Sequence, residues 1–301
     1  MPDPRDRRGA GRPALLRAES PACAAAAGRP ADGRSVGMSF RPVVPLPGHA
    51  GWAFLKRTRP AQQEAFQQTG QVKRLSDHFT ESISKVTSVE DLMSDRRLRE
   101  VALGAFGLKD DIDSHYFVKQ ILSSNTREDG SLANKMSDKR YLAMARAFGF
   151  GDLGGPRTGD TGFARRILDQ YHDREFEAAI GESDPNMRLV LGLNRDLGDV
   201  VKRSDNTNAN WYAVMANPPL RQVFETALGL PKAFGTLDLD RQLSTFRDRA
   251  EAQFGVREIA DFNNDEMQSK LVTRFLAMAD LQAGTTRGMT GASIALTLLG
   301  G

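Results

Sequence analysis

Cysteine is almost missing from this sequence: Cys23 is the only one, and none follows it. A disulfide within the chain and a metal site built on thiolates are therefore excluded, as is a thiol nucleophile after residue 23. A continuous run of about eighteen apolar residues is also absent, so we expect no transmembrane helix. With 40% hydrophobic and 26% charged residues, the composition is that of a globular protein.

Most of the chain has no excess of positive or negative charge. The 301 residues include 41 Lys and Arg and 38 Asp and Glu, but seven of these basic and four of these acidic residues lie within 1–37. From Met38 onward, 34 basic residues therefore balance 34 acidic ones. A uniform basic field that attracts phosphate backbones is excluded, so no nucleic-acid partner is expected, although a local basic patch is compatible with this balance.

Residues 1–37 differ in composition from the rest: Ala, Arg, Gly and Pro make up 26 of the 37, with no Lys and no aromatic residue. Such a segment buries too little apolar surface to fold, so we expect it to be disordered. Its longest apolar run, 22–27, is too short for the apolar part of a secretory signal. The composition resembles translated GC-rich DNA, which favours a natural start at Met38 over a functional tail.

The rest of the chain is dominated by helical patterns. Prolines and Gly48 predict an extended lead-in over 39–48, and the helical pattern begins near Thr58, with Pro60 in the first turn. Apolar residues then recur at helical spacing on one face; the clearest series is Leu75, Phe79, Ile83 and Val86. Alternating apolar and polar runs are scarce, and no hairpin is evident. The sequence therefore predicts an all-α fold.

Capping residues mark where helices begin and end. Good N-cap residues precede three helices, at Ser88 with Asp91 as a capping box, at Asp184-Pro185 and at Asn217-Pro218. Glycines end four apolar-periodic runs, at Gly107, Gly149, Gly229 and Gly255. The glycine-rich stretch 149–161 is the clearest internal loop.

An internal repeat organises the helical part. The segments 93–108 and 215–230 both read Met-x-(Asp/Asn)-x-x-Leu-Arg-x-Val-x-x-x-Ala-x-Gly-Leu without a gap. A second match aligns 140–145 with 274–279, twelve residues further apart. We therefore expect two related helical units, about 88–148 and 210–282, packed as one domain over 38–284. The arginines after each Leu, Arg99 and Arg221, are expected to point outward and pair with a neighbouring acid, although a functional role is the alternative.

No catalytic, cofactor or metal site is predicted. The stretch 149–154, Gly-Phe-Gly-Asp-Leu-Gly, matches a dinucleotide fingerprint, but it follows a helix and runs into Gly155-Pro156, so we interpret it as a loop. The four histidines stand at no metal-ligand spacing; they are His49, His78, His115 and His172. No G-x-S-x-G elbow and no P-loop occurs. The aromatic residues Trp52, Trp211 and Tyr212 are expected to pack in the interior.

Several stretches resemble a known family. They are 51–58, 62–66, 88–92 with the repeat unit that follows, and 131–141, of which Ala-Phe-Gly-Leu at 105–108 and Leu-Ala-Asn at 132–134 are the most specific. Together they resemble domain of unknown function 1217, an α-proteobacterial family, over about Met38 to Gly284. The resemblance implies an all-helical fold and genes that are often found among flagellar genes. It implies no catalytic residue.

The sequence leaves two hypotheses for the function. The first is a non-enzymatic interaction protein with a protein partner in flagellar assembly or its regulation, located in the cytoplasm or at the flagellum. Its small apolar tail, 285–301, would be flexible until it docks on that partner, or it would pack on its own core. The alternative is an enzyme or a small-ligand binder with a pocket between the two repeats; convergent ionisable groups in a deep pocket would favour it.

Overall fold

The computed structural model describes residues 40–204 and 206–288. Within these residues the fold is all-α, as predicted, with thirteen α-helices, four short 3-10 helices and no strand. None of the described helices is long and apolar enough to cross a membrane. The predicted disordered extension 1–37, with Cys23, lies outside the described residues, and so do residues 289–301 of the predicted tail.

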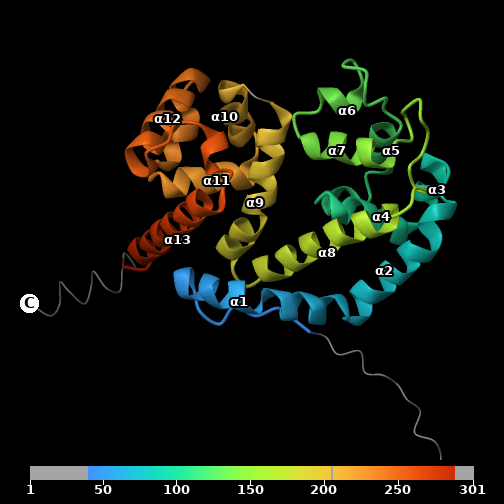
Figure 1. The fold of residues 1–301 in the computed structure, drawn as a ribbon, viewed down its shortest axis with the longest axis horizontal. Coiled ribbons are helices and arrows are strands. Elements are labelled where there is room, and N and C mark those ends of the chain that lie inside the picture. The colour runs from blue at the N-terminus through green and yellow to red at the C-terminus, as the bar shows by residue number, and fades with distance from the viewer. Residues whose placement is uncertain (1–39, 205, 289–301) are drawn as a thin grey trace, which may run out of the picture. The chain divides into compact units, whose positions relative to one another are not determined.

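Most of the helices follow one another with short connections, and the α7–α8 loop, residues 149–162, is a long one (Figure 1). The first eight α-helices are α1 Gly48–Gln67, α2 Gly70–Ser82, α3 Val89–Ser94, α4 Arg96–Ala105, α5 His115–Leu122, α6 Leu132–Lys135, α7 Lys139–Phe148 and α8 Phe163–Gly181. The remaining five are α9 Pro185–Arg203, α10 Thr207–Met215, α11 Pro218–Ala227, α12 Leu239–Phe254 and α13 Asp265–Gly288. The 3-10 helices are η1 Ile83–Lys85, η2 Lys109–Asp111, η3 Lys232–Thr236 and η4 Ile259–Phe262.

Two element boundaries differ from the sequence prediction. Helix α1 begins at Gly48, about ten residues before Thr58, so Pro60 lies in its interior and not in its first turn. Pro47 is the extended residue before the helix and Gly48 has φ +61°, so the turn predicted to prevent a helix instead starts one. At the other end, α13 continues to Gly288, beyond the start of the predicted tail at 285.

The predicted capping signals are confirmed. Ser88 and Asp91 form a reciprocal capping box at α3, and the side chains of Asp184 and Asn217 accept hydrogen bonds from backbone N–H groups at the starts of α9 and α11. All four predicted stop glycines adopt the left-handed conformation that ends a helix: Gly107, Gly149, Gly229 and Gly255. Local signals therefore fix most helix ends.

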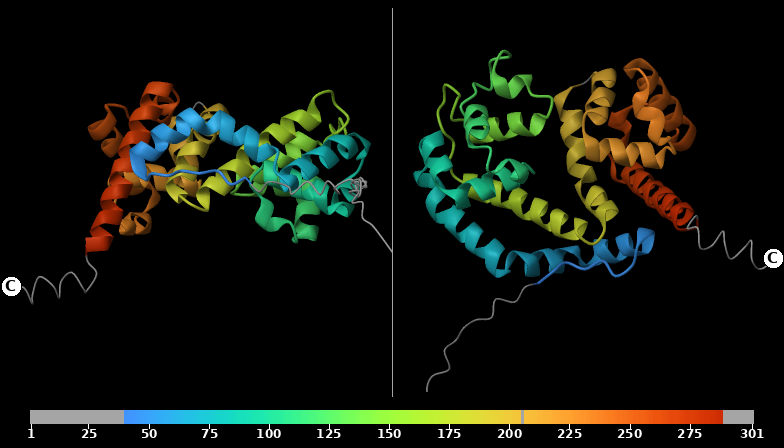
Figure 2. Two further views of the ribbon diagram at one scale, coloured as in Figure 1. Left: turned by 90° about the horizontal axis from the view of Figure 1, so that it is seen from below. Right: turned by 180° about the vertical axis from the view of Figure 1, so that it is seen from behind.

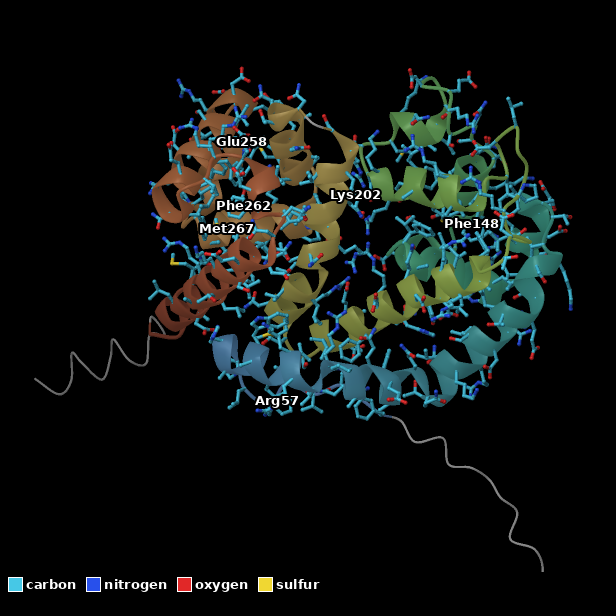
Figure 3. The ribbon with its side chains drawn as sticks, in the orientation of Figure 1. Arg57, Phe148, Lys202, Glu258, Phe262 and Met267 are labelled. Carbon is cyan, nitrogen blue, oxygen red and sulfur yellow. The ribbon has the colours of Figure 1, made fainter. Side chains whose placement is uncertain are left out.

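The interior consists of two hydrophobic cores. Residues from α2 to the first half of α8 form one core, which includes Phe79, Phe148 and Tyr171. Residues from the second half of α8 to α13 form the other, together with Leu55 of α1. Figure 3 labels Phe148 in the first core and Phe262 in the second. The predicted interior aromatic Trp211 is fully buried in the second core, and Trp52 and Tyr212 pack against it.

Helix α8 connects the two cores. Tyr171 belongs to the first core and Phe176, little more than one turn later, to the second. Helices α1 and α2 run one after the other beside α8 (Figures 1 and 2). Phe66, near the end of α1, packs against both cores and meets Phe176 edge to face at 6.0 Å between ring centroids.

Residues matched in the repeat make equivalent backbone hydrogen bonds. In the first unit Leu108 N–H donates to Leu103 and Gly107 N–H to Gly104, which is a Schellman motif. In the second unit Leu230 N–H donates to Glu225 and Gly229 N–H to Thr226. The helix packing differs, however, because α4 packs chiefly against α8 whereas α11 packs chiefly against α13.

The repeated arginines bind carbonyl groups at helix ends. Arg99 and Arg221 donate to the carbonyl oxygens of Met93 and Met215, which the repeat also matches. The prediction that Arg99 points outward is therefore wrong: Arg99 is only 6% exposed, because it reaches back under the end of α3. Arg221 is half-buried and does pair with Glu225, at 2.6 Å, as predicted.

The second matched pair of arginines has a similar role. Arg140 Nη1 donates to the carbonyl oxygen of Gly107 at 2.6 Å, and Arg274 Nε donates to that of Ala227 at 2.7 Å. Each therefore covers the C-terminal end of the repeat helix, α4 or α11, where carbonyl groups lack helical partners and the helix dipole favours a cation.

Candidate anion-binding cleft

A cleft of about 500 Å³ lies between the two cores, with walls from the end of α4, α7, the α7–α8 loop, α8 and α9. Figure 1 shows these helices around the centre of the molecule's folded part. Figure 3 labels Lys202, the neighbour of Arg203, at the end of α9 near α7. Thirteen residues line the cleft: Ala105, Phe106, Arg140, Ala143, Arg146, Ala147, Arg157, Gln170, Asp173, Arg174, Arg195, Asp199 and Arg203.

Six of the lining residues are arginines and only two are acidic. Helical spacing explains how they reach one cavity. On α9, Arg195, Asp199 and Arg203 are four residues apart and share one face, and on α8 Gln170, Asp173 and Arg174 are three or four apart. Helix α7 contributes two arginines, and the α7–α8 loop contributes one. The cleft is therefore basic although the chain after Met38 is neutral.

Three of these arginines are held by carboxylates. Arg195 makes two hydrogen bonds to the buried Glu177, at 2.5 and 3.0 Å. Arg140 is hydrogen-bonded to Asp138 through Nε and Nη2. Arg157 lies 3.5 Å from the buried Asp152 and donates to the carbonyl of Arg146. These contacts fix the guanidinium groups and form part of the wall.

The pKa values of the fixed arginines reflect these contacts. Burial lowers the pKa of Arg195, but the hydrogen bond and charge of Glu177, with Asp196, raise it by more, so the net change is upward. Burial likewise lowers the pKa of Arg140, and Asp138 raises it to a net increase. Both side chains are therefore permanently cationic.

Arg174 is in a less favourable environment. Its ion pair with Asp196 is long, at 3.9 Å, and its buried Nε has no hydrogen-bond partner. Burial, and then the charge of Arg195, lower its pKa, and Asp196 and Glu177 compensate only in part. A Cβ built on Gly107 would lie 3.3 Å from Arg140 Nη1 and 3.4 Å from Arg174 Nη1, so these two cations converge there.

Arg146 and Arg203 are exposed and form no ion pair with any carboxylate of the described residues. Arg174 has only its long contact with Asp196. Of the two lining acids, Asp173 accepts a hydrogen bond from Gln63 and lies 3.6 Å from Arg59, outside the cleft. Three guanidinium groups are thus available to a ligand, and Asp199 is the one lining acid without an ion pair among the described residues.

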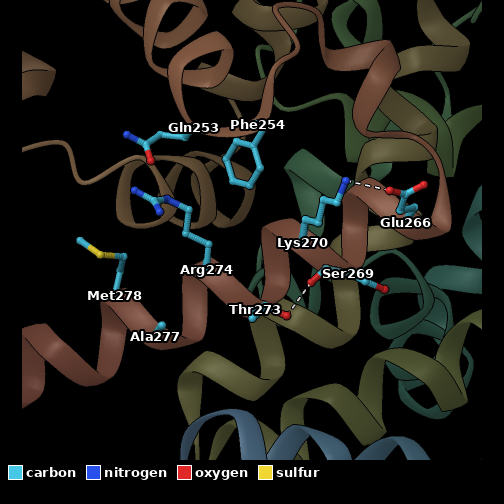
Figure 4. Close-up of a pocket in the computed structure, with 9 residues that line it drawn as sticks. All are labelled: Gln253, Phe254, Glu266, Ser269, Lys270, Thr273, Arg274, Ala277 and Met278. Carbon is cyan, nitrogen blue, oxygen red and sulfur yellow. Dashed lines mark hydrogen bonds and ion pairs between the residues drawn. The ribbon is translucent and has the colours of Figure 1, made fainter.

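A second hollow, of about 760 Å³, lies along α13 (Figure 4). Here Lys270 pairs with Glu266 at 2.7 Å, and Arg274 caps α11. The second repeat match aligns Arg140 with Arg274 and, one residue beyond its end, Arg146 with Asp280. Of the two cleft arginines in the first unit, Arg140 therefore has a basic counterpart in the second unit and Arg146 has an acidic one.

The comparisons with known proteins place the chain in a family. The model of the family described as "Protein of unknown function (DUF1217)" matches residues 105–268. The chain belongs to the DUF1217 family. All thirteen lining residues of the cleft fall within the range that the DUF1217 model matches.

A solved structure has the same fold. The crystal structure of protein AGR_C_984 from Agrobacterium tumefaciens superimposes with a TM-score of 0.64 and is 24% identical; the match covers 80% of this chain and 99% of that one. This likeness supports the all-α fold of this DUF1217 member. No curated protein matches the chain.

The histidines considered in the sequence lie apart from the cleft lining. His78 lies 2.6 Å from Asp95, the N-cap residue of α4, and His172 lies 2.8 Å from the hydroxyl of Ser76. Burial lowers the pKa of His172. His49 and His115 are exposed, and the described residues contain no cluster of three or more His, Cys, Asp or Glu suited to a metal ion. The stretch 149–154 lies in the α7–α8 loop, as interpreted.

The cleft itself was missed by the sequence interpretation. Its arginines come from segments as far apart as Arg140 and Arg203, and all except Arg146 stand near an acidic residue in the sequence. The charge count therefore showed neutrality, and only the tertiary arrangement of α7, α8 and α9 around the cleft brings the cations together. The absence of acid next to Arg146 in the sequence was a weak local signal.

Proposed function

We propose that the protein binds an anionic ligand in the arginine-lined cleft and has no catalytic activity of its own. The observation that supports this function is the convergence of six arginines, three of them without a close carboxylate partner, on one cavity. Arginine is suited to this task because its planar fork of donors fits the oxygens of carboxylates and phosphates.

The nearest approach to a catalytic pair also supports binding over catalysis. The Ser76 hydroxyl is close to His172 Nε2, but it also donates to the carbonyl of Val72, one helical turn earlier. Among the described residues, no carboxylate accepts a hydrogen bond from His172 to orient the ring. A nucleophile and a base without an orienting group match a structural contact better than an active site.

The process that we propose for this binding is flagellar assembly or its regulation. Its support is the resemblance to a family whose genes are often found among flagellar genes. The test replaces the gene in a motile host with an Arg146→Glu/Arg203→Glu variant. The control is Arg97→Glu/Arg249→Glu, which changes the same charge at two exposed arginines outside the cleft.

Swimming and filament number are then measured. We expect the cleft variant to be impaired and the control to be normal. Normal motility after deletion of the gene would reject the flagellar process. A defect in the deletion strain combined with normal motility of the cleft variant would reject the cleft as the functional site.

A second candidate is a protein partner that docks on α13. The hollow there includes Phe254, Ala277 and Met278, and Leu281 on the same helix is 60% exposed. Capture of flagellar components from motile cells by the Met38 form, lost in Leu281→Glu but kept in Leu239→Glu, would support it. Leu239 is a matched control because it is 59% exposed on another helix. Equal capture by both variants would reject this surface.

A further inference from the structure

We infer that the ligand of the cleft is a small molecule that carries a phosphate group, bound by Arg146, Arg174 and Arg203. This inference rests on the proposed anion-binding function and narrows it to one chemical class. It concerns the three arginines that have no close carboxylate partner among the described residues.

The arrangement of donors fits a tetrahedral oxyanion. Arg146 comes from α7, Arg174 from α8 and Arg203 from α9, so the three cations approach the cavity from three walls. A carboxylate has two oxygens in one plane, which a single guanidinium can bind in a bidentate contact. A phosphate group has three acceptor oxygens in a tetrahedral arrangement, which donors from several directions can bind. Arginine donors on three walls of the cleft therefore fit a tetrahedral phosphate better than a planar carboxylate.

The charge of the cleft fits the same class. Arg140, Arg157 and Arg195 are balanced by Asp138, Asp152 and Glu177. Arg174 forms its long ion pair with Asp196, and the two remaining arginines, Arg146 and Arg203, exceed Asp199 by one charge. A phosphomonoester carries about 1.5 to 2 negative charges near neutral pH, so it would balance this excess and add opposite charge beside Arg174, whose partner Asp196 is also hydrogen-bonded to Arg195.

The size and the apolar part of the wall favour a small molecule. A volume of about 500 Å³ lies within the range of small-molecule sites, roughly 300 to 1,000 Å³. The wall includes Ala105, Phe106, Ala143 and Ala147, against which an organic group can pack. The cavity thus offers cations for the phosphate and carbon surface for the rest of the ligand.

The environment of Arg174 adds an independent reason. Its charge is partly buried next to Arg195 and is poorly compensated, and burial with this neighbour lowers its pKa. A bound dianion would supply the missing opposite charge. Binding of a dianion would therefore reduce the free-energy cost of keeping Arg174 charged in a partly buried position.

The experiment measures binding to the full chain by isothermal titration calorimetry at constant ionic strength. The phosphate probes are inorganic phosphate and pyrophosphate, and the carboxylate probe is citrate. We expect a phosphate probe to bind at least tenfold more tightly than citrate. Arg146→Gln/Arg203→Gln should weaken that binding at least tenfold, while Arg97→Gln/Arg249→Gln leaves it unchanged.

Two further variants make the result specific. Arg146 and Arg203 are exposed, so their replacement should leave the circular dichroism spectrum and Tm unchanged, and lost binding is then not lost folding. Arg174→Lys keeps the charge but removes the planar fork, so it should also weaken phosphate binding. Unchanged phosphate affinity in the Arg146→Gln/Arg203→Gln protein would overturn the inference.

The outcomes separate this inference from the proposed function. Citrate binding that exceeds phosphate binding and is lost in the cleft variant would overturn the phosphate class and keep the anion-binding function. If none of the three probes binds but an acidic peptide does, and the cleft variant loses this binding, the phosphate class is likewise overturned and the anion-binding function is kept. If no anion binds and the Arg146→Glu/Arg203→Glu strain swims normally, both proposals fail.

Discussion

At the scale of single residues, arginine serves two purposes in this fold. Arg99 and Arg274 are turned toward backbone carbonyl groups and close helix ends, whereas Arg146 and Arg203 stand exposed at the cleft. Sequence alone does not separate the two kinds, because each occurs as a charged residue within a helical pattern. Burial and hydrogen-bond partners distinguish them.

The Arg99→Ala variant should show how much a buried capping arginine stabilises the fold. The substitution removes the buried stem of Arg99 and leaves the carbonyl of Met93 without this donor, so we expect a loss of about 2 to 3 kcal/mol in the free energy of unfolding. Arg97→Ala, two residues earlier and exposed, should change stability by less than about 0.5 kcal/mol. Urea denaturation measures both; equal small losses would refute the capping role.

Asp95 makes part of the stability depend on pH. Burial raises its pKa, but the hydrogen bonds from His78 and from the N–H groups of Leu98 and Arg97 lower it by more, so its pKa is below the ordinary value. The charged form therefore stabilises the fold above about pH 4, and this contribution is lost as pH falls through the folded-state pKa. The repeat places the uncharged Asn217 at the equivalent N-cap.

The Asp95→Asn variant copies that second unit and keeps a good N-cap. At pH 7 we expect it to be less stable than the wild type by about 1 kcal/mol, because it loses the charged contact with His78. Denaturation at a series of pH values should show this gap closing as acid neutralises Asp95 in the wild type. A gap that persists unchanged at low pH would contradict the electrostatic explanation.

At the scale of the helices, the sequence predicted the helix ends marked by a capping residue or a stop glycine better than the start of α1. Capping residues such as Asp184 and stop residues such as Gly107 act within a few residues, so their effect can be read locally. The start of α1 was misplaced because Pro60 is tolerated inside a helix whose side chains Leu55 and Phe66 pack on the cores. That tolerance depends on tertiary packing, which a local pattern does not contain.

Gly107 and Gly229 form a matched pair that separates stability from binding. Both have positive φ, +69° and +66°, so replacing either by Ala should cost about 1 kcal/mol through backbone strain. Only at Gly107 would the new methyl group lie 3.3 to 3.4 Å from the guanidinium groups of Arg140 and Arg174; at Gly229 it meets the flexible end of Met278 at 3.5 Å.

We therefore expect similar Tm losses in Gly107→Ala and Gly229→Ala, but weaker phosphate binding in the first alone. Thermal denaturation and calorimetric titration of the two variants measure these effects. Equal phosphate affinity in the two proteins would show that the end of α4 does not shape the cleft.

At the scale of the whole folded part, two cores share one helix, and the cleft lies where they meet. The all-α class and the helix ends were predictable, because they follow from periodicity and capping. The cleft was not predictable, because Arg146 of α7 and Arg203 of α9 belong to different halves of the fold and line one cleft only in the folded structure. A charge count over the chain averages this local concentration away.

The sharing of α8 predicts that the two cores unfold together. Glu177, on the second half of α8, is 5% exposed and makes two hydrogen bonds to Arg195 of α9. Glu177→Ala leaves this largely buried cation with Asp196 alone, at 3.1 Å, and should cost about 2 kcal/mol. Asp169→Ala, on the same helix but exposed, should cost little. The fluorescence of Trp211 and Trp52, which both pack in or against the second core, follows that core, and far-ultraviolet circular dichroism follows all helices.

We expect the two signals to give one coincident denaturation transition in the wild type and to shift together in Glu177→Ala, because α8 cannot leave one core without exposing the other. Separate transitions, with Trp211 exposed while about half of the helical signal remains, would mean that the cores are independent. A ligand bound by α7, α8 and α9 would then be needed to hold them together, and phosphate would merge the two transitions. In a single cooperative unit, phosphate would instead raise one common midpoint.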